Sequence, residues 1–235
     1  SSHFNSSPGL RFGLVVDKDS ACPLSVEHIQ AWLAQRLDQS MPGLVFICTS
    51  MDGFIARENG EIDWLDEANK AIPAGDDLGW TAFQHKYSVI IMGRKSFEKV
   101  RAMPLAAWPY HKPIVVLTRN AHFLQEEQKR KPLPDSPLQK VSQSLPCESL
   151  QQLMVRLEAE YGKTAGIYID GGETIRAFLE EGLVQEMTVT LAPVLLGRGL
   201  PLFAGLSGGD RKVDLVLSKS WPCGFVQNTF RFASA

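Results

Sequence analysis

A glycine followed by two cations and a hydroxyl is the feature of this chain most suited to binding chemistry. Residues 89–92 are apolar, and they lead into Gly93, Arg94, Lys95 and Ser96. This order predicts a strand that enters a helix through a glycine turn. The first turn of a helix offers unpaired N–H groups and the positive end of the helix dipole, which suit a phosphate, and the cations add charge. The alternative is a solvated first turn with ordinary surface cations.

A second strand-to-helix turn carries the pair Gly171 and Gly172, followed by Glu173 and Thr174. Glycine adopts positive φ readily and lets a ligand approach the backbone closely. The Gly-x-Gly-x-x-Gly fingerprint of the Rossmann fold does not follow any predicted strand. An ordinary βα turn also favours glycine. Two such turns at strand ends of one sheet would suit a dinucleotide diphosphate lying across the sheet edge.

A third polar group ends another apolar stretch. Thr118 and Arg119 directly follow the strand pattern of residues 113–117. A hydroxyl and a guanidinium at a strand end could hold a terminal phosphate monoester. Taken alone, an exposed loop arginine is the favoured interpretation.

These groups need a scaffold of alternating strands and helices. The apolar patterns predict strands at residues 44–49, 88–92, 113–117, 165–170, 186–194, 212–221 and 224–232, and helices at residues 78–85, 96–101, 150–161 and 174–181. Apolar strands separated by helices indicate an α/β fold with a mostly parallel sheet and helices on both faces. The last two strands have no helix between them, so we expect a C-terminal antiparallel hairpin.

The break at Met41-Pro42-Gly43 divides the chain. We expect residues 1–40 to form an appendage with one amphipathic helix at residues 25–37, and residues 43–235 to form the main domain. Residues 120–146 are polar and carry four prolines, which predicts a long surface loop. The apolar stripe of the N-terminal helix would pack on its own domain or on a second subunit.

Bulk properties narrow the class of protein. The chain has 235 residues, 44% of them hydrophobic, and a formal net charge of -2, so it shows no basic footprint for nucleic acid. No stretch is long enough to span a membrane, and the N-terminus lacks the order of a signal peptide. Four scattered cysteines without Cys-x-x-Cys favour reduced thiols in a cytoplasmic protein, and neither they nor the histidines have the spacing of a metal site.

Taken together, these pieces resemble the dihydrofolate reductase superfamily over roughly residues 44–203. In that family the first strand and the following loop lie over the nicotinamide, and here they correspond to residues 46–56. The resemblance implies that the turn from Met92 to Ser96 binds cofactor phosphates, that Thr118 and Arg119 lie near the adenosine 2′-phosphate, and that the paired glycines bind the diphosphate. It therefore implies NADPH as the cofactor.

A closer resemblance is to the branch related to the C-terminal reductase domain of bacterial riboflavin biosynthesis. This resemblance rests on short sequence motifs at residues 50–56, 62–65, 108–110, 182–187 and 192–203. That branch usually carries an Asp-Asp/Asn-Pro segment that helps recognise a ribose-phosphate substrate, whereas residues 97–100 here read Phe-Glu-Lys-Val. The resemblance implies a hydride transfer to a pyrimidine or pterin-like heterocycle, and a homodimer. The alternatives are a non-catalytic NADPH-binding module on the same fold and dihydrofolate reductase proper.

Hydride transfer needs a fixed nicotinamide, a flat acceptor and a proton source. We expect Cys48, Thr49, Ile55 and Ala56 to line the nicotinamide.

The candidate proton relay is Asp77, whose carboxylate would face an apolar pocket with a raised pKa, and Asp52 is its rival. Asp77 would equally suit the N-cap of the helix at residues 78–85, and Asp52 would suit a turn. Trp64 and Trp80 could wall the substrate pocket, although buried aromatics more often belong to the core.

Overall fold

The structure is a computed structural model, and it describes residues 41–103, 108–130, 141–144, 148–163, 165–207 and 209–232. The appendage expected at residues 1–40, with its helix at residues 25–37, lies outside the described residues. The division into an appendage and a main domain therefore stays a prediction.

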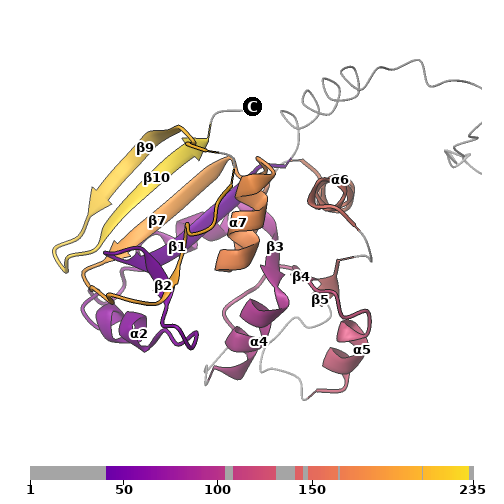
Figure 1. Cartoon of the computed structure of the whole chain (residues 1–235), viewed down its shortest axis with the longest axis horizontal. Coiled ribbons are helices and arrows are strands. Elements are labelled where there is room, and N and C mark those ends of the chain that lie inside the picture. The colour runs from indigo at the N-terminus through magenta and orange to yellow at the C-terminus, as the bar shows by residue number, and fades with distance from the viewer. Residues whose placement is uncertain are drawn as a thin grey trace, which may run out of the picture. The chain divides into compact units, whose positions relative to one another are not determined.

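One mixed sheet organises the described part of the chain (Figure 1). Its strand order is β5-β4-β3-β6-β1-β7-β10-β9. The strands are β1 (Gly43–Ser50), β3 (Tyr87–Gly93), β4 (Ile114–Leu117), β5 (Val141–Gln143), β6 (Gly166–Asp170), β7 (Glu186–Ala192), β9 (Val213–Ser220) and β10 (Val226–Phe232). The six strands from β5 to β7 are parallel, whereas β10 runs antiparallel to both β7 and β9. The predicted parallel sheet with a C-terminal hairpin is confirmed.

Helices cover both faces of this sheet. They are α2 (Asp63–Asn69), α3 (Trp80–Gln84), α4 (Arg94–Ala102), α5 (Phe123–Gln128), α6 (Leu150–Tyr161) and α7 (Gly172–Glu180). Side chains of α6 and α7 join one buried cluster, and those of α3, α4 and α5 join another on the opposite face. A small second sheet pairs β2 (Phe54–Ala56) with β8 (Leu200–Pro201).

Alternation along the central strands explains the two clusters. Val89 and Ile91 of β3 pack in the first, and Ile90 and Met92 pack in the second; none of the four is exposed. Strands buried on both faces read as continuous apolar runs, which is why the sequence marks them clearly. Fully burying one such side chain contributes about 1.5–3 kcal/mol, so this core fixes the strand ends firmly.

The predicted loop at residues 120–146 is wrong in part, because α5 and β5 lie within it. Phe123 anchors α5 in the second cluster, and Glu127 faces inward, where Arg101 of α4 pairs with it at 2.8 Å.

Helix starts also differ from the prediction. The helices α4 and α7 each begin two residues earlier than expected, at Arg94 and Gly172, so both cations of the first motif belong to a helical first turn. The helix α3 begins two residues later, at Trp80, because Leu78 and Gly79 adopt positive φ.

Candidate active site

Three of the sequence motifs meet at the carboxyl edge of the sheet. Met92 of β3 is paired with Asp170 of β6, and Gly93 is paired with Leu117 of β4. The residues that follow these strands therefore emerge side by side. After β3 the chain enters α4 on one face of the sheet, and after β6 it enters α7 on the other. In open α/β sheets such a divergence of helices marks the crevice in which ligands bind, and we therefore infer a β3–β6 crevice at these two strand ends.

The two glycine turns are in direct contact. A Cβ atom added to Gly171 would lie 2.3 Å from Oγ of Ser96, and one added to Gly93 would lie 3.2 Å from Oγ1 of Thr174. Gly171 has a φ of +90°, which side chains rarely tolerate. Glycine is therefore required at Gly171 both for its backbone conformation and for the close approach of the turns.

Both helices that start at this crevice lack a side-chain cap. The N-cap residues are Gly93 for α4 and Gly171 for α7, and neither helix has a side-chain cap hydrogen bond. By contrast, Ser149 and Gln152 form a complete capping box on α6. The first-turn N–H groups of α4 and α7 have no partner among the described residues, so they can donate to an anion.

The cations around the crevice differ in their partners. Arg94 donates to Glu98 at 2.9 Å, and Lys95 lies 3.1 Å from Glu173, so this second pair joins the first turns of α4 and α7. Arg119 is exposed and, within the described ranges, has no ion-pair or hydrogen-bond partner. The neighbouring Thr118 hydroxyl accepts the N–H of Asn120 at 3.0 Å. Arg119 is thus available for a ligand.

The residues that were predicted to line the nicotinamide lie near the end of β1 and in β2. Cys48 is half-buried, and burial raises its thiol pKa to about 12, so it is no nucleophile at neutral pH. Thr49 is buried, and its hydroxyl has no partner in the described structure. Ile55 reaches the twin glycines, because a Cβ on Gly172 would lie 2.5 Å from its Cδ1. Ala56 is buried and pairs with Leu200 of β8.

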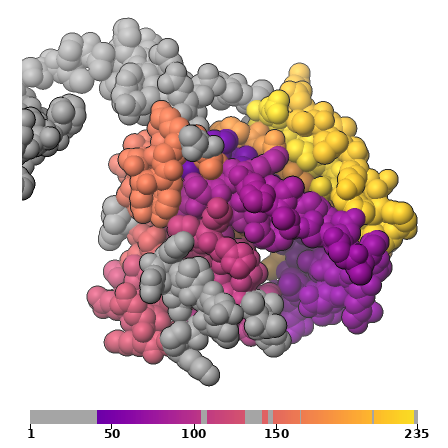
Figure 2. Space-filling view, turned by 180° about the vertical axis from the view of Figure 1, so that it is seen from behind, coloured from indigo at the N-terminus to yellow at the C-terminus, as the bar shows by residue number. Residues whose placement is uncertain are grey.

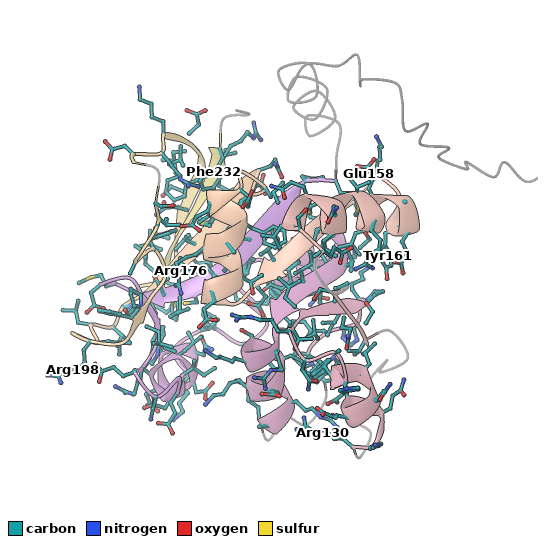
Figure 3. All side chains as sticks on the ribbon, turned by 45° about the vertical axis from the view of Figure 1, so that its right-hand side comes forward. Arg130, Glu158, Tyr161, Arg176, Arg198 and Phe232 are labelled. Atoms are coloured by element: carbon teal, nitrogen blue, oxygen red, sulfur yellow. The ribbon has the colours of Figure 1, made fainter. Side chains whose placement is uncertain are left out.

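Arg176 of α7 holds this small sheet in place. Its guanidinium, labelled in Figure 3, donates to two carbonyl oxygens. These are the oxygens of Pro201 at 3.0 Å and Leu202 at 3.3 Å. Since β8 pairs with β2, this contact keeps Ile55 against the α7 turn. An orphaned hydroxyl at Thr49 and a glycine cradle at the two turns fit a dinucleotide bound across the crevice.

The carboxylates of both candidate proton donors accept hydrogen bonds that stabilise the local structure. Asp77 accepts the backbone N–H groups of Gly79 at 2.9 Å and Thr81 at 2.8 Å, and it thereby caps α3. These hydrogen bonds, with that to the Thr81 side chain first, lower the pKa of Asp77, which is opposite to the expected direction.

Asp52 accepts hydrogen bonds from Ser50 at 2.6 Å and from the N–H of Gly197 at 2.7 Å. The Ser50 bond is the main reason that the pKa of Asp52 is lowered. Asp52 therefore ties the β1–β2 turn to the loop after β7.

The two tryptophans lie in different clusters. Trp64 of α2 is buried with Leu78, Ala192, Trp221 and Phe225, and its Nε1–H has no partner there.

Trp80 of α3 is half-buried and stacks on Phe83 with the ring centroids 5.9 Å apart. Figure 2 shows a hollow in the molecular surface between the indigo-to-purple part of the chain, which includes α2, and the magenta-to-pink part, which includes α4. A flat acceptor could enter there.

The sequence reasoning missed Asp170, the last residue of β6. Its Oδ2 accepts from the Tyr110 hydroxyl at 3.0 Å, and its Oδ1 accepts the Gly171 N–H at 2.8 Å. Burial raises the pKa of Asp170, and the hydrogen bonds oppose that rise. A carboxylate at the end of an apolar strand, directly before two glycines, was the available signal.

The described ranges contain neither a membrane-spanning helix nor a cluster of metal ligands. None of their helices has the length and apolar character that crossing a bilayer requires. No group of three or more histidine, cysteine, aspartate or glutamate residues in these ranges could hold a metal ion.

Comparison with known proteins places this architecture in a family. The model of the RibD C-terminal domain matches residues 43–226. The uncharacterised protein YwjB of Bacillus subtilis is 31% identical over 166 residues, which are 70% of this chain and 83% of YwjB.

Solved structures agree with this match. A provisionally assigned riboflavin biosynthesis protein from Shewanella sp. PV-4 is 32% identical with a TM-score of 0.67, over 82% of this chain and 99% of that one. The Thermotoga maritima diaminohydroxyphosphoribosylaminopyrimidine deaminase/5-amino-6-(5-phosphoribosylamino)uracil reductase is 15% identical with a TM-score of 0.59, over 87% of this chain and 60% of that one, which is a likeness of fold.

Proposed function

Because the chain belongs to the RibD C-terminal domain family, we propose that it is an NADPH-dependent reductase that transfers a hydride to a pyrimidine or pterin-like heterocycle. The observation that carries this proposal is the meeting of two uncapped helix N-termini at the β3–β6 crevice. A diphosphate there would receive N–H donors from both helices and the charge of Arg94 and Lys95.

Different residues at the crevice would bind different parts of the cofactor. The first turn of α7, with Gly172, Glu173 and Thr174, would hold the diphosphate together with the turn from Gly93 to Ser96. Arg119 and Thr118 would hold the adenosine 2′-phosphate. When bound, NADPH supplies the hydride. Cys48, Thr49, Ile55 and Ala56 would orient the nicotinamide and exclude water from it, with the Thr49 hydroxyl donating to its polar edge.

The acceptor would occupy the hollow beside α2 and α3, with Trp80 offering a half-buried ring face for stacking. The Trp64 Nε1–H would donate to an acceptor oxygen. Asp77, or its rival Asp52, would be ionised at neutral pH because its pKa is lowered, so it would have to take up a proton from water and pass that proton to the acceptor.

An anaerobic assay with NADPH deuterated at the transferable position tests the proposal. The panel contains 5-amino-6-ribosylaminouracil, its 5′-phosphate, dihydropterins and dihydrofolate. We expect deuterium in the product of a pyrimidine or pterin acceptor. We also expect Asp77→Asn to lower kcat without changing the KM for NADPH. If Asp52→Asn lowers kcat instead, the rival residue is the relay.

A second candidate function is a non-catalytic NADPH-binding module. One observation favours it: the carboxylates of Asp52 and Asp77 are both engaged by backbone N–H groups. NADPH binding without turnover across the panel would select this candidate. The absence of NADPH binding to the wild-type chain would refute both.

A further inference from the structure

The last residue of β6 connects the two phosphate-binding turns. Asp170 immediately precedes the twin glycines, and its two carboxylate oxygens have different partners. One oxygen accepts the N–H of the next residue, Gly171, at 2.8 Å. The other accepts the hydroxyl of Tyr110, which lies 60 positions earlier in the sequence, at 3.0 Å. A single side chain thus joins a local turn to a distant segment.

The Tyr110 end of this link continues to α4. Tyr110 is buried, and its ring packs edge-on against Trp108 with the centroids 5.7 Å apart. Trp108 in turn packs against Phe97 of α4 at 5.9 Å. Phe97 is fully buried and lies three positions after Arg94, the first residue of the cationic turn. The chain of contacts therefore runs from the start of α4 to the start of α7.

The Gly171 end of the link decides which N–H groups face the ligand. Because Asp170 takes the Gly171 N–H, that group is unavailable to a phosphate, and the donors left at this turn are the first-turn N–H groups of α7. Gly171 makes this bond with a φ of +90°. A carboxylate is suited to this position because both of its oxygens accept, and both partners are donors.

We propose that Asp170 and Tyr110 are positioning residues, which fix the α7 turn relative to the α4 turn so that both helices donate to one diphosphate. This inference rests on the proposed NADPH-binding function. It assigns no contact with the reacting atoms to either residue. It predicts a selective effect on the diphosphate part of the cofactor and none on the adenosine phosphate held by Arg119.

Two variants test the link. Tyr110→Phe removes one hydroxyl and keeps the packing of the ring. Asp170→Asn keeps an acceptor for the Gly171 N–H. Toward Tyr110 it presents a neutral amide N–H₂, so that bond must reverse its direction and loses the charge assistance of the carboxylate. The matched control is Tyr161→Phe, which also removes one tyrosine hydroxyl. Tyr161 is the last residue of α6 and lies away from the carboxyl edge of the sheet (Figure 3).

Affinities for NADPH and for 2′-AMP, which lacks a diphosphate, are measured by calorimetry on the full chain. We expect each variant to lower the affinity for NADPH at least about fivefold and the affinity for 2′-AMP less than about twofold. The double variant should lose no more NADPH affinity than the single variant with the larger loss. The Tyr161→Phe control should match wild type. Unchanged NADPH affinity in both variants would overturn the link, and so would equal losses for both ligands, which indicate general disruption. If the wild-type chain fails to bind NADPH, the proposed function itself fails, and the inference falls with it.

Discussion

Arg119 differs from the other cations at the carboxyl edge because no described carboxylate neutralises it. Arg94 and Lys95 have acidic partners at 2.9 Å and 3.1 Å, whereas Arg119 is exposed and unpaired within the described residues. A charge-assisted hydrogen bond contributes about 1.5–3 kcal/mol, so Arg119→Ala should weaken NADPH at least about tenfold. NADH, which lacks the 2′-phosphate, should keep its affinity. Titration of both cofactors by nicotinamide fluorescence checks this.

The control for Arg119→Ala is Arg198→Ala. Arg198 is an exposed arginine in the loop between β7 and β8, and it points away from the sheet in Figure 3. The Arg198→Ala substitution also removes one positive charge, but it should change the affinity for neither NADPH nor NADH. Equal loss of NADPH and NADH in Arg119→Ala would remove the 2′-phosphate role from Arg119.

Alanine substitutions at Gly171 and Gly182 distinguish the effect of backbone strain on stability from an effect on ligand binding. Both have positive φ, at +90° and +67°, but an added Cβ meets Ser96 only at Gly171, whereas Gly182 faces open space. Alanine at either position should destabilise the fold by about 1–3 kcal/mol, as seen in urea unfolding. Only Gly171→Ala should also weaken NADPH, because it pushes the two turns apart. Similar NADPH affinities in the two variants would show that the contact between the turns is dispensable.

At the scale of elements, α3 depends on Asp77 for its start. Asp77→Ala should cost about 1 kcal/mol of stability at neutral pH, the usual loss for a helix cap. The pKa of Asp77 is lowered in the folded state, so its carboxylate stabilises the fold above the ordinary carboxyl pKa. That contribution is lost as the pH falls through the lowered value, and the variant should then approach wild type. Urea unfolding across acid pH measures this convergence.

Asparagine provides the matched comparison at this position. Asp77→Asn retains a side-chain oxygen for the cap but carries no titrating charge. Its stability difference from wild type should be small at neutral pH. A constant gap between Asp77→Ala and wild type at every pH would show that the cap does not need the carboxylate.

The elements that the sequence predicted well are those with a local signal. The strands β1, β3 and β6 are buried apolar runs ended by polar or glycine residues, and the glycine turns directly follow two of them. The helix α5 gave no such signal, because it has six residues and its inward-facing Glu127 is neutralised by Arg101 from another helix.

Candidate-site residues follow the same rule. Turn residues such as Gly171 were predictable from their neighbours, because positive φ and a helix start are local properties. The role of Asp170 was not, because its second partner is Tyr110, 60 positions away. The lowered pKa of Asp52 also depends on the backbone N–H groups of Leu196 and Gly197, which only the folded loop brings near.

At the scale of the whole molecule, the edge strand β9 exposes apolar side chains. Leu215 and Leu217 are 59% and 56% exposed, and Val213 and Val216 of the same strand are also exposed. Exposed apolar edges of this kind are commonly covered by another chain. We expect a homodimer that uses this edge, so the double substitution Leu215→Lys and Leu217→Lys should yield a monomer. Light scattering coupled to chromatography measures the mass.

Truncation of residues 1–40 provides the comparison for that experiment. If the predicted N-terminal helix joins the subunits, the truncated chain should be monomeric while the β9 variant stays dimeric. A monomeric wild-type chain would contradict the expectation of a dimer altogether.

The central claim is that the first turns of α4 and α7 together bind the diphosphate of a phosphorylated nicotinamide dinucleotide. A crystal structure of the complex with NADP⁺ measures this directly. The account predicts diphosphate oxygens within hydrogen-bond distance of the backbone N–H groups of Gly172 and Glu173 and of the α4 first turn, with the 2′-phosphate at Arg119. A dinucleotide bound on another face, or a diphosphate that contacts neither helix start, would contradict it.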